Sequence, residues 1–193
     1  MGFFRTLLKE IINVGREPIF TPDFSKPEYD NRLEYISQGG TTESWERAKQ
    51  ANNWVFRESE IEIYTRYLKE VKKVSDMYFS LMQKIQKDWS VLYNTKEYSG
   101  QRATTFENEC LKDIDYYLRM REIDRKYDQS TPTNVPAFTR LAMLYEKQER
   151  YEDSVSVCKK AILLDIDERS RLIRMIKKAG RTPTAEEESL LDN

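Results

Sequence analysis

The sequence contains no histidine and only two cysteines, Cys110 and Cys158, among its 193 residues. The lack of histidine removes a frequent general base and metal ligand. No glycine-rich loop that could hold a phosphate group occurs, so we expect neither an enzyme nor a bound cofactor or metal. Each cysteine lies alone within an apolar helical pattern, which favours buried free thiols over a disulfide between them. Free thiols favour a reducing, cytoplasmic location.

Long apolar runs and an excess of one charge are also missing. No run of about 18 apolar residues exists that could cross a membrane as a helix. The 32 Lys and Arg residues balance 33 Asp and Glu residues, which argues against a nucleic-acid partner. Glycine and proline number six each, too few for a flexible or low-complexity chain. The charged fraction of 34% fits a helical protein that exposes much of its surface.

The first 40 residues divide into an amphipathic stretch and an arm. Residues 2–14 carry apolar side chains at helical spacing: Phe3, Phe4, Leu7, Leu8, Ile11 and Ile12. We expect this stretch to form a helix that docks on the body of the protein, with attachment to a membrane surface as the alternative. Residues 16–40 contain Pro18, Pro22 and Pro27, which disfavour helix, and we expect an irregular connector there.

The remaining residues, 41–193, are predicted to form one helical domain. Residues 42–93 contain neither proline nor glycine, and their apolar side chains recur every three or four residues. They form either one long helix or two abutting ones, with a break near Asn52–Asn53 or at residues 57–59. A second long helix is expected at 101–127. The fold class predicted is all-α, an elongated array of antiparallel helices.

A helical hairpin is expected at 136–164, followed by a helix at 168–179 that caps it. Lys177, Lys178 and Gly180 suit the end of that capping helix. Its side chains Leu172, Ile173 and Ile176 are expected to pack inward, whereas Arg169, Arg171, Arg174, Lys177 and Lys178 are expected to face solvent. Thr184 and Glu187 have the spacing of a capping box, which predicts a short acidic helix at the end of the chain.

The hairpin carries the most specific pattern in the sequence. Its first helix contains Phe138, Leu141, Ala142 and Tyr145, and its second contains Ser154, Cys158 and Ala161. The small residues allow the two helices to cross closely. These residues and spacings resemble one tetratricopeptide repeat. Ser154 replaces the usual alanine, Cys158 the usual aromatic residue, and Ile166 a frequent proline. No second clear copy exists, and residues 85–127 could form a degenerate one.

The resemblance implies a scaffold or adaptor that binds protein or peptide on the inner face of the first hairpin helix. It places Thr139, Arg140, Met143, Glu146 and Lys147 on that face. Alternatively, the preceding long helix covers the face. Between Pro136 and Arg181 there are 11 Lys and Arg residues and 7 Asp and Glu residues. This small basic surplus could receive an acidic peptide or a nucleic-acid backbone, or could simply be a solvated surface. Self-association through the long helix is another alternative.

Overall fold

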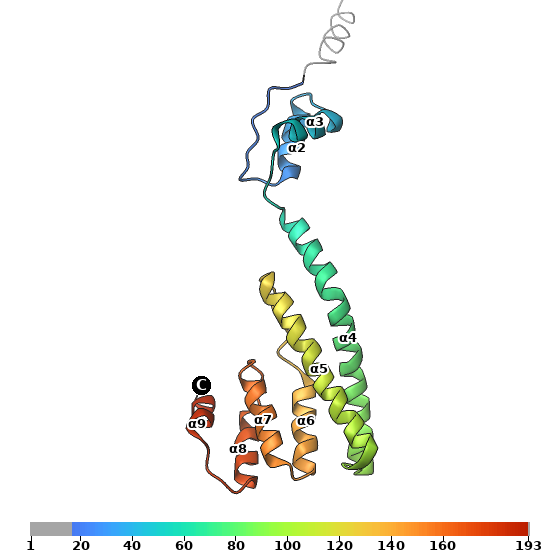
Figure 1. Ribbon diagram of the computed structural model, residues 1–193, viewed down its shortest axis with the longest axis vertical. Helices are drawn as coiled ribbons and strands as arrows, with labels where there is room; N and C mark the ends of the chain where they lie inside the picture. The colour runs from blue at the N-terminus through green and yellow to red at the C-terminus, as the bar shows by residue number, and fades with distance from the viewer. Residues whose placement is uncertain (1–16, 193) are drawn as a thin grey trace, which may run out of the picture. The chain divides into compact units, whose positions relative to one another are not determined.

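The computed structural model describes residues 17–192, and over that range the protein is all-α, as predicted (Figure 1). The helices are α2 (Glu28–Ser37), α3 (Thr42–Asn52), α4 (Glu60–Thr95), α5 (Gly100–Lys126), α6 (Pro136–Lys147), α7 (Tyr151–Ile162), α8 (Arg169–Lys178) and α9 (Ala185–Leu191). The helix expected at 2–14 lies outside the described residues. Among the described helices, none is both long and apolar enough to cross a membrane.

The chain divides into two compact units, one ending at Arg66 and the other beginning at Tyr67. This division lies further along the chain than the boundary predicted after residue 40. The reason is that α2 and α3 pack on each other, with the rings of Tyr35 and Trp45 5.5 Å apart. Hydrophobic burial ties the two helices into one core, and a boundary between them would expose it.

The prediction that residues 16–40 are irregular is wrong for α2. Pro27 lies at the N-cap of this helix, a position where its missing N–H group costs little. The buried side chain of Asn31 then fixes the preceding turn. Its amide donates to the carbonyl oxygens of Asp23 (2.9 Å) and Pro27 (3.0 Å), and its Oδ1 accepts from the N–H group of Asp23 (2.7 Å).

Aromatic side chains supply the core of the first unit. Trp45 is fully buried, and the rings of Phe20, Tyr35, Trp54 and Phe56 lie around it with centroids 5.4–5.8 Å away. Such ring pairs contribute beyond their buried area. Within residues 17–66 these rings form the core, because no aliphatic side chain of that range is buried.

The segment predicted as one long helix or two abutting helices is interrupted between α3 and α4. Asn53 ends α3 in the left-handed conformation (φ 51°), which asparagine tolerates better than most residues. Helix α4 begins after Ser59, whose hydroxyl accepts from the N–H group of Glu62 (3.2 Å). Seven residues, 53–59, separate the two helices. The two predicted break positions, near Asn52–Asn53 and at residues 57–59, lie at the two ends of this segment.

In the second unit, large rings fill the space between α4 and α5. Trp89 lies 5.7 Å from Phe106, and Tyr78 lies 6.0 Å from Tyr117. Residues 96–99 join the two helices. Large rings between α4 and α5 differ from the small residues expected where the two helices of a tetratricopeptide hairpin cross. The smaller side chains Ala103 and Cys110 of α5 are nevertheless almost fully or fully buried.

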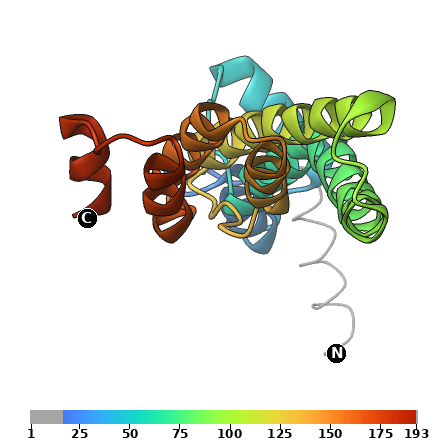
Figure 2. The ribbon, with the colours of Figure 1, turned by 90° about the horizontal axis from the view of Figure 1, so that it is seen from below.

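Helices α6, α7 and α8 pack closely, with α7 between the other two (Figures 1 and 2). Ala142 and Ser154 are completely buried where α6 meets α7. The Ser154 hydroxyl donates to the carbonyl oxygen of Ala142 (3.0 Å), which satisfies a polar group that would otherwise be buried unpaired. Small residues thus set the distance between these two helices.

The last helix, α9, is held against α7 by charged side chains. Arg181 pairs with Glu152 of α7 (2.7 Å) and with Glu187 of α9 (2.7 Å). Glu187 also completes the predicted capping box with Thr184. The hydrogen bonds from Arg181 lower the pKa of Glu187 to about 2 against the opposing effect of burial. The end of the helical stack is thereby closed by ion pairs.

Candidate partner-binding face

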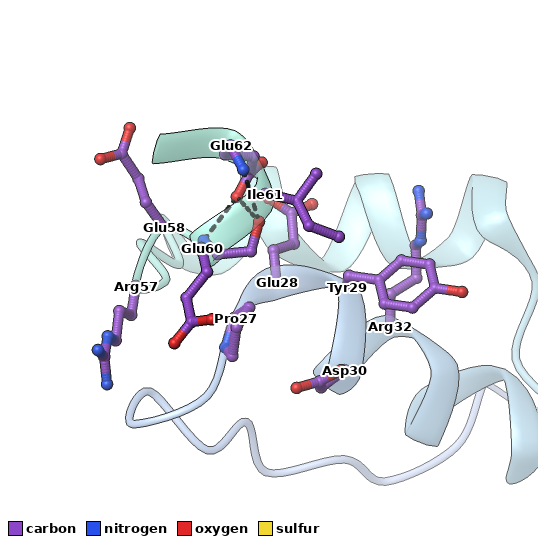
Figure 3. A pocket seen from close by; sticks show the side chains of 11 residues that line it. Pro27, Glu28, Tyr29, Asp30, Arg32, Arg57, Glu58, Glu60, Ile61 and Glu62 are labelled. Atoms are coloured by element: carbon purple, nitrogen blue, oxygen red, sulfur yellow. Dashed lines mark hydrogen bonds between the residues drawn. The ribbon is translucent and has the colours of Figure 1, made fainter. Parts of the chain in front are cut away.

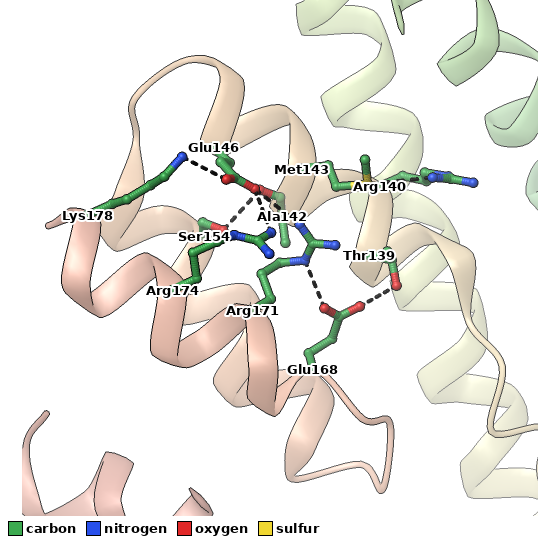
Figure 4. A network of polar contacts seen from close by, with 10 residues as sticks. All are labelled: Thr139, Arg140, Ala142, Met143, Glu146, Ser154, Glu168, Arg171, Arg174 and Lys178. Carbon is green, nitrogen blue, oxygen red and sulfur yellow. Dashed lines mark hydrogen bonds and ion pairs between the residues drawn. The ribbon is translucent and has the colours of Figure 1, made fainter.

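All five residues predicted to bind a partner lie on α6. Lys147 is exposed, whereas Thr139, Arg140, Met143 and Glu146 are partly buried. Figure 4 shows four of them together with the side chains of α8 that reach toward α6. The helix therefore presents these residues on a surface that it shares with α8 and α4.

Glu146 is the centre of a charge network between α6 and α8 (Figure 4). Its carboxylate accepts from Arg171 (3.2 Å), Arg174 (3.0 Å) and Lys178 (2.9 Å), all from α8. Burial alone would raise the pKa of Glu146, but the hydrogen bonds from Lys178 and Arg174 outweigh it and lower the pKa. The Glu146 side chain is only 15% exposed, whereas Arg174 is 48% and Lys178 44% exposed. Both cations therefore keep much of their surface open to a second anion.

A second carboxylate fixes the buried end of this network. Glu168, just before α8, accepts from Nε of Arg171 (2.9 Å) and from the hydroxyl of Thr139 on α6. Arg171 thus bridges Glu146 and Glu168. Thr139 and Arg171 are thus held by contacts within the chain, and Arg174 and Lys178 are the more exposed members of the network.

The other side of the predicted face contacts α4 and the loop that follows it. The guanidinium group of Arg140 lies 5.6 Å from the ring centre of Trp89 at the end of α4, and its Nη1 lies 3.5 Å from the sulfur of Met143. The Lys147 ammonium group lies 5.9 Å from the ring of Tyr98. The alternative that the long helix covers the face thus applies in part, at Arg140, where the ring of Trp89 lies.

The expectations for α8 need two corrections. Ile173 is exposed instead of packed inward, and Met175 is fully buried beside Leu172 and Ile176. Arg171 is 15% exposed instead of solvated, because it lies between two carboxylates. The spacing of Arg171, Arg174 and Lys178 already places them on one side of a helix. Their common partner on α6 is 25 or more residues away in sequence, so the pattern could not name it.

We define the inner face as the five predicted residues of α6 together with Arg171, Arg174 and Lys178 of α8. It contains five cationic side chains and one acidic side chain, and Glu168 adjoins it. No cluster of His, Cys, Asp or Glu that could hold a metal ion occurs within residues 17–192. The face therefore carries an excess of positive charge.

Several polar side chains of α4 and α5 are buried in the core of the second unit. Among the described residues, both carboxylate oxygens of Asp113 on α5 lack a hydrogen-bond partner. The hydroxyl of Tyr78 on α4 also lacks one there. Both residues are completely buried. Burial raises the pKa of Asp113 to about 7, and burial together with the Asp113 charge raises the pKa of Tyr78. The two cysteines are buried and unbridged, as expected, and burial raises the pKa of both thiols.

The first unit contains a cavity of about 810 Å³ between the start of α2 and the start of α4 (Figure 3). Five acidic side chains line it, from Glu28, Asp30, Glu58, Glu60 and Glu62. Arg32 and Arg57 are the two basic residues of its lining, and Tyr29 and Ile61 contribute apolar surface. No pattern in the sequence indicated this cavity, because α2 was not predicted.

No known protein family, no curated protein and no solved structure matches this chain.

Proposed function

We propose that the protein is a non-enzymatic interaction module, a scaffold or adaptor with a tetratricopeptide-like hairpin, and that its inner face binds an acidic peptide. The observation that carries the proposal is the convergence of three α8 cations on the single carboxylate of Glu146 (Figure 4). A carboxylate already binds there, and two of the three cations remain nearly half exposed.

The excess of positive charge determines the class of partner. Charge-assisted hydrogen bonds from arginine to carboxylate are about twice as strong as neutral ones. Arg174 and Lys178 can each donate to a second carboxylate without breaking the network, because each makes one hydrogen bond with Glu146. Arg140 and Lys147 extend the positive surface along α6. An extended segment with aspartate or glutamate at alternate positions fits this arrangement.

Self-association through α4 remains the alternative, and the exposed apolar side chains of that helix favour it. Five of them recur at helical spacing along one side of α4, namely Ile61, Tyr64, Leu68, Phe79 and Tyr93, whereas Met77 and Val91 lie on the opposite side. Such a stripe can pair with the same stripe of a second copy.

The binding proposal predicts the effect of reversing two charges. With a fluorescein-labelled (Asp-Gly)5 peptide, we expect saturable binding to the full chain by fluorescence polarisation, weakening as salt is raised. The double variant Arg174→Glu, Lys178→Glu should bind at least tenfold more weakly. The variant Arg174→Gln, Lys178→Gln should fall between the two, because it removes attraction without adding repulsion.

The matched control is Lys72→Glu, Lys73→Glu, which makes the same charge change at exposed positions on α4. It should bind as the wild type does. A (Lys-Gly)5 peptide should not bind. Equal affinity of the wild type and the α8 double variant, with both shown by circular dichroism to be folded, would exclude the inner face as the binding site.

A further inference from the structure

The first unit leaves an apolar stripe uncovered on α2. This helix buries Asn31 and Tyr35, yet Tyr29, Leu33 and Ile36 are 58%, 48% and 38% exposed. Their spacing places them along one side of the helix. Ile61, across the cavity of Figure 3 from Tyr29, is 79% exposed. A contiguous exposed apolar surface of this kind marks a contact site.

The charges around this stripe define what can cover it. Among residues 17–192, Glu28 of the cavity pairs with Lys49 and Glu58 pairs with Arg66. The other three carboxylates, of Asp30, Glu60 and Glu62, form no ion pair with a described residue, and Glu62 accepts hydrogen bonds from Ser59. A helix that docks here should therefore have an apolar side for the stripe and cations for the acidic rim.

The chain itself carries a segment with these properties. Residues 2–14 contain six apolar residues at helical spacing, and residues 1–16 contain Arg5, Lys9 and Arg16 against the single acid Glu10. The described chain begins next to this segment, at Glu17, which pairs with Arg47 of α3 (2.8 Å). Phe20 then contacts Tyr35 of α2, with ring centroids 5.6 Å apart.

The length of residues 2–14 as a helix also matches the length of α2. Thirteen residues in a helix extend about 20 Å, and the ten residues of α2 extend about 15 Å. Since Phe20 already lies beside α2, a segment that ends three residues before Glu17 can reach the stripe of its own chain.

We propose that residues 2–14 bind within the same molecule as an amphipathic helix along Tyr29, Leu33 and Ile36, with Arg5 and Lys9 toward the acidic rim of the cavity. The segment then serves as an internal ligand of the first unit, and this proposal is independent of peptide binding by the inner face.

Disulfide trapping in the full chain tests this proposal. The variant Leu8→Cys, Leu33→Cys joins the segment to the stripe, while the native thiols are buried and weakly reactive. Under mild oxidation we expect a monomeric cross-linked product that forms at least tenfold faster than in the control Leu8→Cys, Leu111→Cys. Leu111 of α5 is 47% exposed, which matches the 48% of Leu33.

Each other outcome would overturn the proposal. Equal rates in the two variants would mean that the segment has no preference for the stripe. A cross-linked dimer whose yield rises with concentration would assign the stripe to the segment of a second copy. Loss of the cross-link on addition of vesicles of phosphatidylcholine and phosphatidylserine, with the protein sedimenting with them, would assign the segment to a membrane surface.

Limited proteolysis provides an independent test that needs no introduced cysteine. In the wild type, trypsin should cut after Arg5 and Lys9 more slowly than in Leu33→Glu, Ile36→Glu, because docking protects those bonds. Equal cleavage rates, with the variant folded, would contradict the docking of the segment on α2.

Discussion

Replacing Ala142 with leucine should lower the free energy of unfolding of the second unit by about 3 kcal/mol and its Tm by about 10 °C. Ala142 is completely buried, and its carbonyl oxygen accepts the hydroxyl of Ser154 from the facing helix α7 (3.0 Å). Three additional carbon atoms have no room at this crossing, so α6 and α7 must separate. The separation would break the Ser154 hydrogen bond and leave its hydroxyl buried without a partner.

Thermal and urea unfolding followed by circular dichroism would measure this effect. The control is Ala185→Leu, the same substitution at an exposed position in the first turn of α9, which should change the stability by less than about 0.5 kcal/mol. If Ala142→Leu unfolds at the temperature of the wild type, α6 and α7 do not cross at small residues.

The second large effect should come from Asp113. Burial raises its pKa from 3.8 to about 7 in the folded protein, so the folded state holds this proton more tightly than the unfolded chain does. The contribution of Asp113 to stability is therefore most favourable at low pH and is lost as pH rises from about 4 to about 7. Above pH 7 the carboxylate is charged and completely buried, and no residue within 17–192 donates a hydrogen bond to it.

Removing the charge should stabilise the protein. We expect Asp113→Asn to gain about 4 kcal/mol more over the wild type at pH 8 than at pH 4, since the pKa shift is about three units and each unit corresponds to about 1.4 kcal/mol. Urea unfolding of both proteins at a series of pH values measures this difference. Comparing the two cancels the opposite pH dependence of carboxylates with lowered pKa, such as Glu146 and Glu187.

The control is Asp115→Asn, two residues along α5, where the carboxylate is 52% exposed and pairs with Arg119. Exposed ion pairs of this kind contribute little, so this variant should show almost no pH-dependent difference. A stability difference between Asp113→Asn and the wild type that does not change with pH would mean that Asp113 titrates normally.

The helices of the second unit could be predicted from the sequence because their signals are local. Pro136 begins α6, Gly180 follows α8 in a left-handed conformation (φ 73°), and Thr184 with Glu187 caps α9. Each of these depends on residues within one or two turns. The all-α class follows from the same local periodicity.

Features that depend on distant residues could not be predicted in this way. Helix α2 was missed because the prolines before it suggested irregular backbone, whereas the side chain of Asn31 organises the turn from 23 to 27. The partner of Arg171, Arg174 and Lys178 was missed because Glu146 lies on another helix. The five candidate residues on α6 remain a prediction, now with a defined set of neighbours.

The most direct test of peptide binding by the inner face is an NMR titration of the 15N-labelled full chain with (Asp-Gly)5. The expected result is saturable shifts of amide signals from 139–147 of α6 and from 171–178 of α8, with small changes on the exposed side of α7 and in α2 and α3. Shifts confined to other helices, or no shifts at peptide concentrations that saturate the polarisation signal, would contradict the assignment of peptide binding to this face.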